Sequence, residues 1–428
     1  MKNLFICLLL LLSVTLTGQT KSIRKSLPLS EGSPESVGMS SERLTRIDAM
    51  LTKSIADGEI PGAVALVARK GKIVYFKAFG TAAKDQAQNR DDIFRIASQS
   101  KAITATAVMM LWEEGKFRLD DPISKYIPEF KNPRVLSNFR YADTTYSTVP
   151  ADQEITIRHL LTHTSGIGYG VIDQDERFKM IYSKAGITDL FTTGSVTIGE
   201  SVKKLAKLPL HFNPGGDYLY SEGLDVLGYF IEIISGMPFD EYLRKHLFDP
   251  LGMADTWFYL PSENGKRLVP VQWKVKGEWG SYPVTFYDPD YPVKGSRTFF
   301  SGGAGLSSTA RDYATFLQMY LNGGELNGVR FLSRTTVDLI MQNQVGDLWE
   351  DSSGRGYGLA FGLQNQKGAA KGGLGSIGSF EWGGYFNTSY FADPEEKVIG
   401  IIMKQTQGST GDNSSWKFQL LVGQSIDD

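Results

Sequence analysis

The stretch FRIASQSKAITATAVMMLWEEG, Phe94–Gly115, begins with small polar residues and continues as an apolar run. Within it, Ser98 stands three positions before Lys101. Residues three apart on a helix lie on the same side, so these two side chains can meet. The helix expected from about Ser98 to Gly115 is apolar nearly all round, which predicts that it is buried. A lysine is costly to bury in its charged form, so Lys101 calls for an explanation.

Nucleophilic catalysis would explain this lysine. A serine at the start of a helix lies beside free backbone N–H groups, which stabilise the oxyanion of an attacked carbonyl. Burial favours the neutral amine of a lysine, and such an amine can take the proton of the serine. The alternative is a lysine that extends from a core helix to the surface. The chain has three more Ser-x-x-Lys spacings, but they lie in a linker or in ordinary amphipathic sequence; they start at Ser22, Ser201 and Ser414.

Other catalytic patterns are weaker. No G-x-S-x-G nucleophile elbow occurs. His159 and His163 are four apart on an expected helix, yet Leu160 stands where a zinc protease has its glutamate. A structural role is therefore favoured for both histidines over a metal site. Gly373–Gly378 fits G-x-G-x-x-G without a capped helix after it, and we expect a flexible loop there. No metal or cofactor is implied.

The N-terminus resembles a targeting segment. Lys2 precedes the apolar run Leu4–Leu12, and small polar residues follow up to Thr20, which predicts a secretory signal peptide cleaved near residues 18–20. An uncleaved anchor is the alternative, but the run is about half the ~20 residues of a membrane-spanning helix, and no later segment approaches that length. The only cysteine is Cys7, so an exported chain, periplasmic or secreted, would carry no disulfide.

Composition and element order predict an α+β protein. The 428 residues are 41% hydrophobic with a net charge of −2, which argues against a nucleic-acid surface or a polybasic membrane patch. We expect a signal peptide (1–20), a linker (21–39), an α/β sheet domain (40–118 and 295–428) and a mostly helical domain (119–294). A first hairpin and late strands should share one sheet, covered by the first and last helices. The expected strands are 62–69, 73–79, 357–363, 385–391 and 398–404, and the two covering helices are 40–57 and 414–424.

Taken in order, several segments resemble the serine β-lactamase-like hydrolases, near class C β-lactamases, family VIII carboxylesterases and penicillin-binding proteins. The matching segments are FRIASQSKAITA, ITIRHLLTHTSGI (155–167), YSEGLDVLGYFIEIISG (220–236), SGGAGLSSTARDYATFLQMYLNGG (301–324) and SFEWGGYFNTSYFADPEEKV (379–398). The resemblance implies the β-lactamase/transpeptidase-like fold, an antiparallel sheet flanked by helices with a helical insert.

The resemblance also implies roles for single residues. Ser98 would be the acylated nucleophile, Lys101 its proton partner and Tyr220 a second proton-transfer residue. The backbone amides of Ser98 and Tyr385 would form the oxyanion hole, and His163 would be structural. Further residues would contact the substrate: Gln99, Glu222, Trp382, Gly383 and Gly384.

Two departures from the β-lactamase pattern bear on the substrate. The Tyr-x-Asn element reads Tyr220-Ser221-Glu222, and Trp382-Gly383-Gly384 stands where β-lactamases carry Lys-Thr-Gly. The positive charge that would meet the carboxylate of a penicillin is missing. We therefore expect an exported carboxylesterase for short-chain or aryl esters, working through an acyl-enzyme. The alternatives are a β-lactamase or D-amino-acid peptidase acting on β-lactams or cell-wall peptides, and a non-catalytic sensor that binds them.

Overall fold

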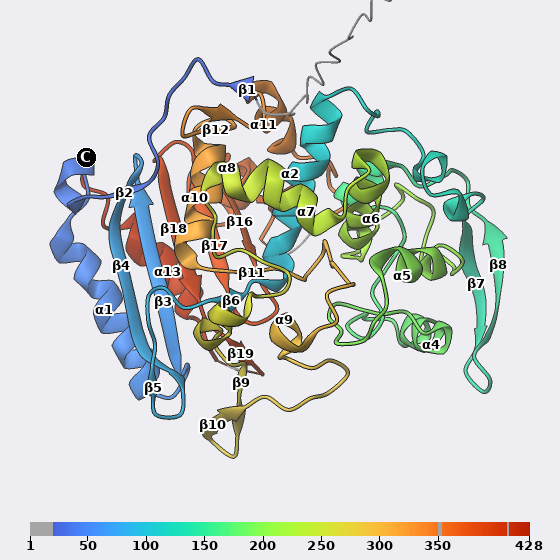
Figure 1. The fold of residues 1–428 in the computed structure, drawn as a ribbon, viewed down its shortest axis with the longest axis horizontal. Helices are drawn as coiled ribbons and strands as arrows, with labels where there is room; N and C mark the ends of the chain where they lie inside the picture. Colours follow the sequence, from blue (N-terminus) through green and yellow to red (C-terminus); the bar gives the residue numbers. More distant parts are fainter. Residues whose placement is uncertain (1–19, 350–352, 409–410) are drawn as a thin grey trace, which may run out of the picture.

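A large antiparallel sheet forms one side of the molecule (Figure 1). The computed structural model describes residues 20–349, 353–408 and 411–428, so the expected signal peptide lies outside them except for its last residue. The strand order is β14-β15-β16-β17-β18-β3-β4-β2, with β5 paired to β4, and only the β2–β4 pair is parallel. The bounds are β2 Ser30–Glu31, β3 Gly62–Arg69, β4 Lys72–Ala83, β5 Gln86–Ala87, β14 Gly356–Tyr357, β15 Gly362–Leu363, β16 Phe380–Gly383, β17 Ser389–Asp393 and β18 Val398–Met403.

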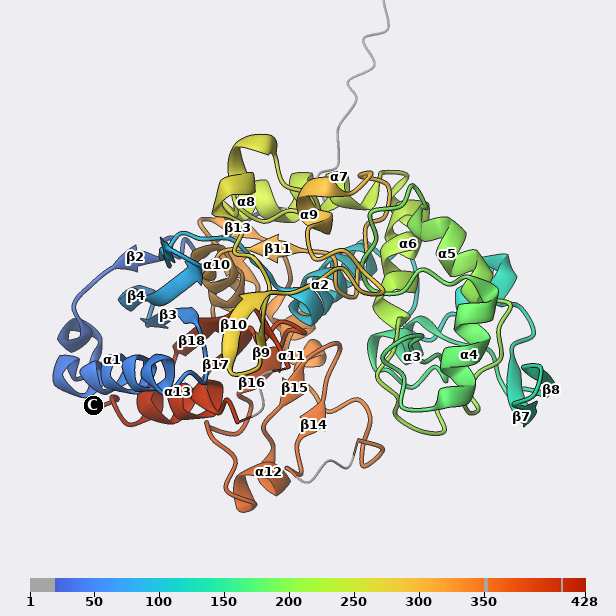
Figure 2. The ribbon, with the colours of Figure 1, turned by 90° about the horizontal axis from the view of Figure 1, so that it is seen from below.

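The central strands β3 and β18 are buried on both faces, as their continuous apolar runs predict. Helices α1 (Ser41–Ala56) and α13 (Ser414–Gly423) lie side by side on one face (Figure 2). Ala63, Ala65 and Val67 of β3 pack in the core beneath these two helices, together with Leu44, Ile47 and Phe418. The alternate residues Val64, Leu66 and Ala68 belong to the main core, with helices α2 (Ser100–Glu113) and α10 (Ala310–Leu321).

The segment 119–294, which we expected as a mostly helical domain, is rich in helices. Its first part, through α6, lies beside the sheet and packs on α2, whereas residues 272–273 pair with residues 406–407 next to the sheet (Figure 1). Its helices are α3 Ile157–Leu161, α4 Glu176–Ala185, α5 Ile198–Leu205, α6 Gly223–Ser235, α7 Phe239–Leu243, α8 Asp249–Leu251 and α9 Tyr291–Lys294. This segment also carries two hairpins that we did not predict: β7 (Arg134–Arg140) with β8 (Thr145–Pro150), and β9 (Gln272–Val275) with β10 (Glu278–Ser281). The β7–β8 hairpin is largely exposed, so its sequence lacks the apolar alternation of a core strand.

Short elements complete the chain: β1 Thr20–Lys21, β6 Phe94–Arg95, β11 Ser307–Ser308, β12 Glu325–Leu326, β13 Val329–Arg330, β19 Thr406–Gln407, α11 Arg334–Ile340 and α12 Gln366–Ala370. The strand expected at 357–363 is two strands with a turn between them. The strand expected at 385–391 is displaced, because residues 384–388 form the turn between β16 and β17.

The segment expected as a linker is held against the sheet domain. Strand β1 pairs with β13, and β2 pairs with β4 at the edge of the large sheet. We refer to residues 20–31 as the N-terminal strap. Composition suggested a free linker because these pairings are made by backbone atoms, which any sequence can supply. Within the described residues, no helix combines the length and apolar character that crossing a membrane requires.

Candidate active site

Ser98 lies in a strained turn at the start of the central helix. Residues Ala97–Gln99 form a single 3₁₀ turn before α2, and Ala97 has a positive φ of 43°. Positive φ is costly for alanine, and such strain concentrates at functional positions. Ser98 is partly exposed, while the residues on both sides of it are buried. In this turn, Ser98 is therefore the residue whose side chain is accessible, between buried neighbours.

Lys101 is 1% exposed and makes three polar contacts. Its Nζ lies 2.7 Å from the carbonyl oxygen of Gly303, 2.9 Å from the hydroxyl of Tyr169 and 3.4 Å from Oγ of Ser98. Three acceptors match the three N–H bonds of an ammonium. In the neutral amine, two N–H bonds can serve Gly303 and Tyr169, which leaves the lone pair directed at the Ser98 hydroxyl. The position of Lys101 thus fits a group that exchanges a proton with Ser98.

Tyr220 reaches the same lysine through its ring. The Nζ of Lys101 lies 4.5 Å from the centre of the Tyr220 ring, and the Tyr220 hydroxyl is buried without a hydrogen-bond partner among the described residues. The expected closeness of Ser98, Lys101 and Tyr220 is therefore present, but the tyrosine that bonds Lys101 in this structure is Tyr169.

Tyr169 is a site residue that sequence reasoning missed. It is 2% exposed, and its ring centre lies 5.6 Å from that of Tyr220. Burial raises the pKa of Tyr169 well above its ordinary value, so this residue stays a neutral phenol. Tyr169 is one of 19 tyrosines, and no spacing in the sequence connects it to Lys101, 68 positions earlier.

The two histidines of the HLLTH segment contact their neighbours. The Nδ1 of His159 accepts from the backbone N–H of Thr156 and so helps to cap α3. The Nδ1 of His163 accepts from the backbone N–H of Ser221 at 3.2 Å, directly after Tyr220. Burial lowers the pKa of His163 well below its ordinary value, so its ring is neutral. The neutral His163 ring therefore positions the segment that contains Tyr220.

The end of β16 lies against the turn that carries Ser98. A Cβ atom added to Gly384 would lie 2.5 Å from the carbonyl oxygen of Ile96, which is closer than real Cβ atoms come. Only glycine permits this approach. It holds the residue before Tyr385 against the turn that carries Ser98. The backbone amides of Ser98 and Tyr385 donate to no other of the described residues. Two free N–H groups near the nucleophile suit the predicted oxyanion hole.

The remaining predicted contacts differ in their surroundings. Trp382 is half-buried, with its ring centre 5.7 Å from that of Tyr220. Gly383 is exposed beside it. Gln99 is fully buried, and its amide has no hydrogen-bond partner among the described residues. Trp382 and Gly383 therefore have exposed surface, whereas the side chain of Gln99 is enclosed by the protein.

Glu222 belongs to a buried group of three carboxyls with Asp189 and Asp225. Burial, together with the two neighbouring carboxylates, raises the pKa of Glu222 well above its ordinary value. Burial therefore favours the protonated form of Glu222, which can donate one hydrogen bond and accept another, as the amide of the Tyr-x-Asn element can. Asp225 accepts from Oγ of Ser301 at 2.5 Å and from the N–H of Gly303, the residue whose carbonyl contacts Lys101.

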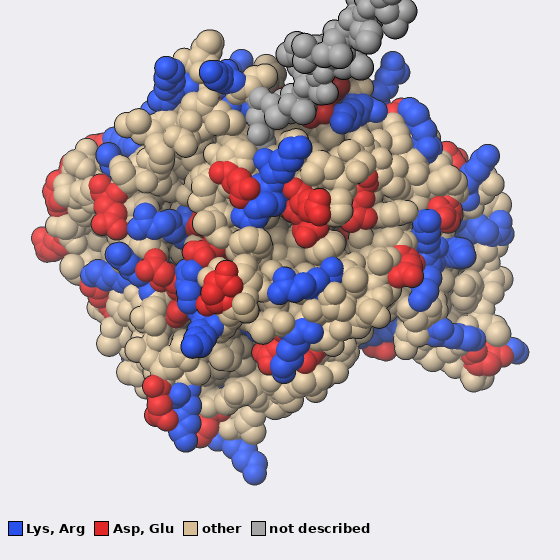
Figure 3. Space-filling model, viewed as in Figure 1, with Lys and Arg blue, Asp and Glu red and all other residues tan. Residues whose placement is uncertain are grey.

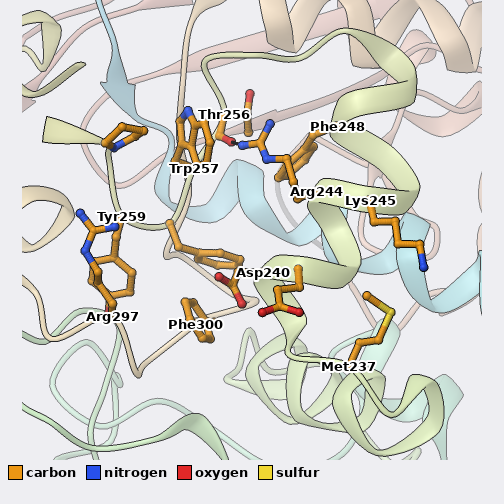
Figure 4. Close-up of a pocket in the computed structure, with 13 residues that line it drawn as sticks. Met237, Asp240, Arg244, Lys245, Phe248, Thr256, Trp257, Tyr259, Arg297 and Phe300 are labelled. Atoms are coloured by element: carbon orange, nitrogen blue, oxygen red, sulfur yellow. Dashed lines mark hydrogen bonds between the residues drawn. The ribbon is translucent and has the colours of Figure 1, made fainter. Parts of the chain in front are cut away.

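A separate pocket of about 460 Å³ lies between α7, the π-helical turn Arg244–Phe248 and the segment around Trp257 (Figure 4). Its aromatic lining includes Tyr259 and Phe300, and the guanidinium of Arg244 lies 3.7 Å from the centre of the Trp257 ring. None of the predicted site residues lines this pocket.

Comparison with known proteins identifies the family and the fold. The beta-lactamase family model matches residues 47–424. Esterase EstB of Burkholderia gladioli is 31% identical over 391 residues, which cover 86% of this chain and 92% of EstB. A protein of Escherichia coli K12, provisionally named a D-alanyl-D-alanine carboxypeptidase, is 27% identical over 79% of this chain and 78% of its own length.

A solved structure, "EstCE1, a hydrolase with promiscuous acyltransferase activity", superposes with a TM-score of 0.76 at 26% identity, covering 90% of this chain and 98% of EstCE1. The expected α+β fold, an antiparallel sheet flanked by helices with a helical insert, is thereby confirmed. The chain belongs to the beta-lactamase family of serine hydrolases.

Proposed function

We propose that this protein is a carboxylesterase that forms an acyl-enzyme on Ser98. The Ser98 hydroxyl attacks the ester carbonyl and passes its proton to the neutral amine of Lys101. The amides of Ser98 and Tyr385 hold the oxyanion, and the alcohol leaves with a proton relayed through Lys101 and Tyr220. Water then attacks the acyl-enzyme and gives up a proton to the same pair. The bond between the acyl carbon and Oγ of Ser98 breaks, the proton returns to Oγ, and the acid is released.

One observation supports an ester over a lactam or a peptide. Trp382 occupies the position of the Lys-Thr-Gly lysine, and its ring packs between Tyr220 and Tyr357. The neighbouring residues are aromatic, and Tyr385 packs beside Phe386 and Phe191. An indole carries no positive charge to form an ion pair with the carboxylate of a β-lactam or a D-alanyl peptide, but it suits the apolar acyl or aryl part of a neutral ester. EstB and EstCE1 support the same choice.

The test is a comparison of substrates on one purified sample. A p-nitrophenyl short-chain ester should be hydrolysed with a kcat/KM at least about 10²-fold above that for a chromogenic cephalosporin, with the Ser98→Ala variant as the blank. Dominance of the cephalosporin would instead support the β-lactamase or D-amino-acid peptidase alternative. Mass spectrometry after brief exposure to the ester addresses the non-catalytic sensor, which would show neither a transient adduct nor hydrolysis.

The export of the protein is also a proposal, based on Lys2, the apolar run Leu4–Leu12 and the small residues that follow. Expression with and without residues 1–20, followed by fractionation of the cells, tests it. Export predicts that ester hydrolysis appears outside the cytoplasm only when these residues are present, together with a loss of mass near residues 18–20.

A further inference from the structure

The N-terminal strap is fixed to the body at regular intervals. The backbone N–H of Ser22 donates to the carbonyl of Gly328 at 2.9 Å, and the hydroxyl of Ser26 donates to the carboxylate of Glu325 at 2.5 Å. Ser30 then pairs with Lys72 as β2 joins the sheet. Because these anchors recur every four residues, the side chains between them have a fixed outward direction.

Two of the outward side chains are large and apolar. Ile23 is 104% exposed and Leu27 is 78% exposed, the two highest values among the large hydrophobic residues that the structure describes. A single exposed apolar side chain is ordinary. Ile23 and Leu27 are four positions apart on one strap, and the anchors on either side hold them in place. Together they form a small apolar surface that no other apolar side chain of the described residues covers.

Basic side chains line a hollow together with Leu27, and Ile23 is followed in the sequence by Arg24 and Lys25. A hollow of about 500 Å³ beside the strap is lined by residues from the strap, the β3–β4 turn, the β17–β18 turn and the end of α10. The cations that line the hollow are Arg24, Lys70, Lys72 and Lys397. The strap carries two more, Lys21 and Lys25. Lys70 pairs with Asp428 at 2.5 Å, but the other five form no ion pair with any carboxylate in the described part of the chain.

The space-filling view shows basic side chains along the edge where the strap runs (Figure 3). Basic side chains project from the upper left edge of the molecule, where the strap runs, and others project from the right-hand edge (Figure 3). Acidic and basic side chains alternate over much of the face between these edges. The net charge of −2 predicted no basic membrane patch, because composition averages over the whole chain. The patch arises from three segments that are distant in sequence, near residues 20–28, 70–72 and 397.

We propose that this surface docks the protein on a membrane containing anionic phospholipid. The five cations without carboxylate partners meet the phosphate and acidic headgroups, and Ile23 and Leu27 enter the interface between headgroups and acyl chains. Binding of a free phosphate or a soluble polyanion would use the cations alone. The two protruding apolar side chains are the feature that favours a bilayer over these ligands.

The experiment measures co-sedimentation of the full chain with vesicles. One set contains phosphatidylglycerol and phosphatidylcholine in equal parts, and the other contains phosphatidylcholine only. The charge variant is Arg24→Ser with Lys25→Ser, and the apolar variant is Ile23→Ser with Leu27→Ser. A matched control is Lys131→Ser with Lys207→Ser, two exposed lysines elsewhere that make no ion pair with a described carboxylate. Residues 1–19 are the same in every variant, so their contribution to binding cancels in the comparison.

The wild type and the control should bind the anionic vesicles better than the neutral ones, and high salt should remove the difference. The charge variant should bind the anionic vesicles about 25-fold more weakly, at about fivefold for each cation. The affinity of the apolar variant for the anionic vesicles should also fall by at least about tenfold. Hydrolysis of a soluble ester should stay unchanged in all variants.

Two results would overturn the proposal. The first is equal binding of the wild type and the charge variant to anionic vesicles. The second is a loss of vesicle binding in the charge variant but not in the apolar variant, together with binding of soluble polyphosphate by the wild type and the apolar variant. That result would indicate a polyanion site rather than a membrane surface. Neither result depends on the proposed esterase activity.

Discussion

The change Tyr169→Phe tests whether the contact between Tyr169 and Lys101 contributes to catalysis. It removes one hydroxyl from a buried, neutral phenol that lies 2.9 Å from Nζ of Lys101, and it leaves the ring in place. Lys101 becomes an ammonium as it takes the proton of Ser98, and a hydrogen bond to a charged group contributes about 1.5–3 kcal/mol. If the contact holds Lys101 in position for proton transfer, kcat/KM for a p-nitrophenyl ester should fall by about 10- to 150-fold.

The assay compares this variant with two others. Tyr220→Phe removes the hydroxyl that we assign to proton transfer, so its loss should be larger, about 10²- to 10⁴-fold. Tyr320→Phe is the matched control. The buried hydroxyl of Tyr320 also contacts α2, but at Thr106, 2.6 Å away and more than one turn beyond Lys101. The control should keep nearly full activity and lose only stability.

Two outcomes would refute the reasoning. A loss of less than about threefold in Tyr169→Phe would show that Lys101 is positioned without this hydroxyl. A larger loss in Tyr169→Phe than in Tyr220→Phe would assign the proton-transfer role to Tyr169. Thermal unfolding of all three variants separates these effects from a change in folding.

Three further changes test other parts of the site. Ser98→Ala should lower ester hydrolysis by at least about 10³-fold and leave the circular dichroism spectrum unchanged; surviving activity would point to another nucleophile. Burial raises the pKa of Asp189 to about 6, so its charged form opposes folding increasingly as the pH rises from about 4 to 6. The free energy of unfolding of Asp189→Asn, measured by urea titration, should therefore rise relative to that of the wild type by up to about 3 kcal/mol between pH 4 and pH 7. A difference between the two proteins that does not change with pH would contradict the raised pKa. Gly384→Ala should reduce activity at least about tenfold because the new Cβ would lie 2.5 Å from the carbonyl oxygen of Ile96, whereas Gly383→Ala, whose nearest contact would be 3.4 Å, should stay close to the wild type. Equal effects of the two glycine changes would show that this approach does not position the oxyanion hole.

The sequence by itself determined the elements that carry strong local signals. The apolar runs of β3 and β18 and the amphipathic pattern of α1 predicted buried strands and a covering helix, because each pattern leaves one arrangement that removes the apolar surface from water. The spacing of Ser98 and Lys101 was readable for a similar reason, since both residues lie within one helical turn. The ordered set of segments around them indicated the family.

Only the tertiary structure decided which distant residues meet. Tyr169 reaches Lys101, and Gly303 offers its carbonyl to the same amine, from loops far along the chain. The N-terminal strap and the β7–β8 hairpin escaped prediction because backbone pairing holds them, and backbone atoms are the same in every residue. The raised pKa of Glu222 and the basic surface around Arg24 depend on burial and on charges brought together by folding, which no local window of sequence contains.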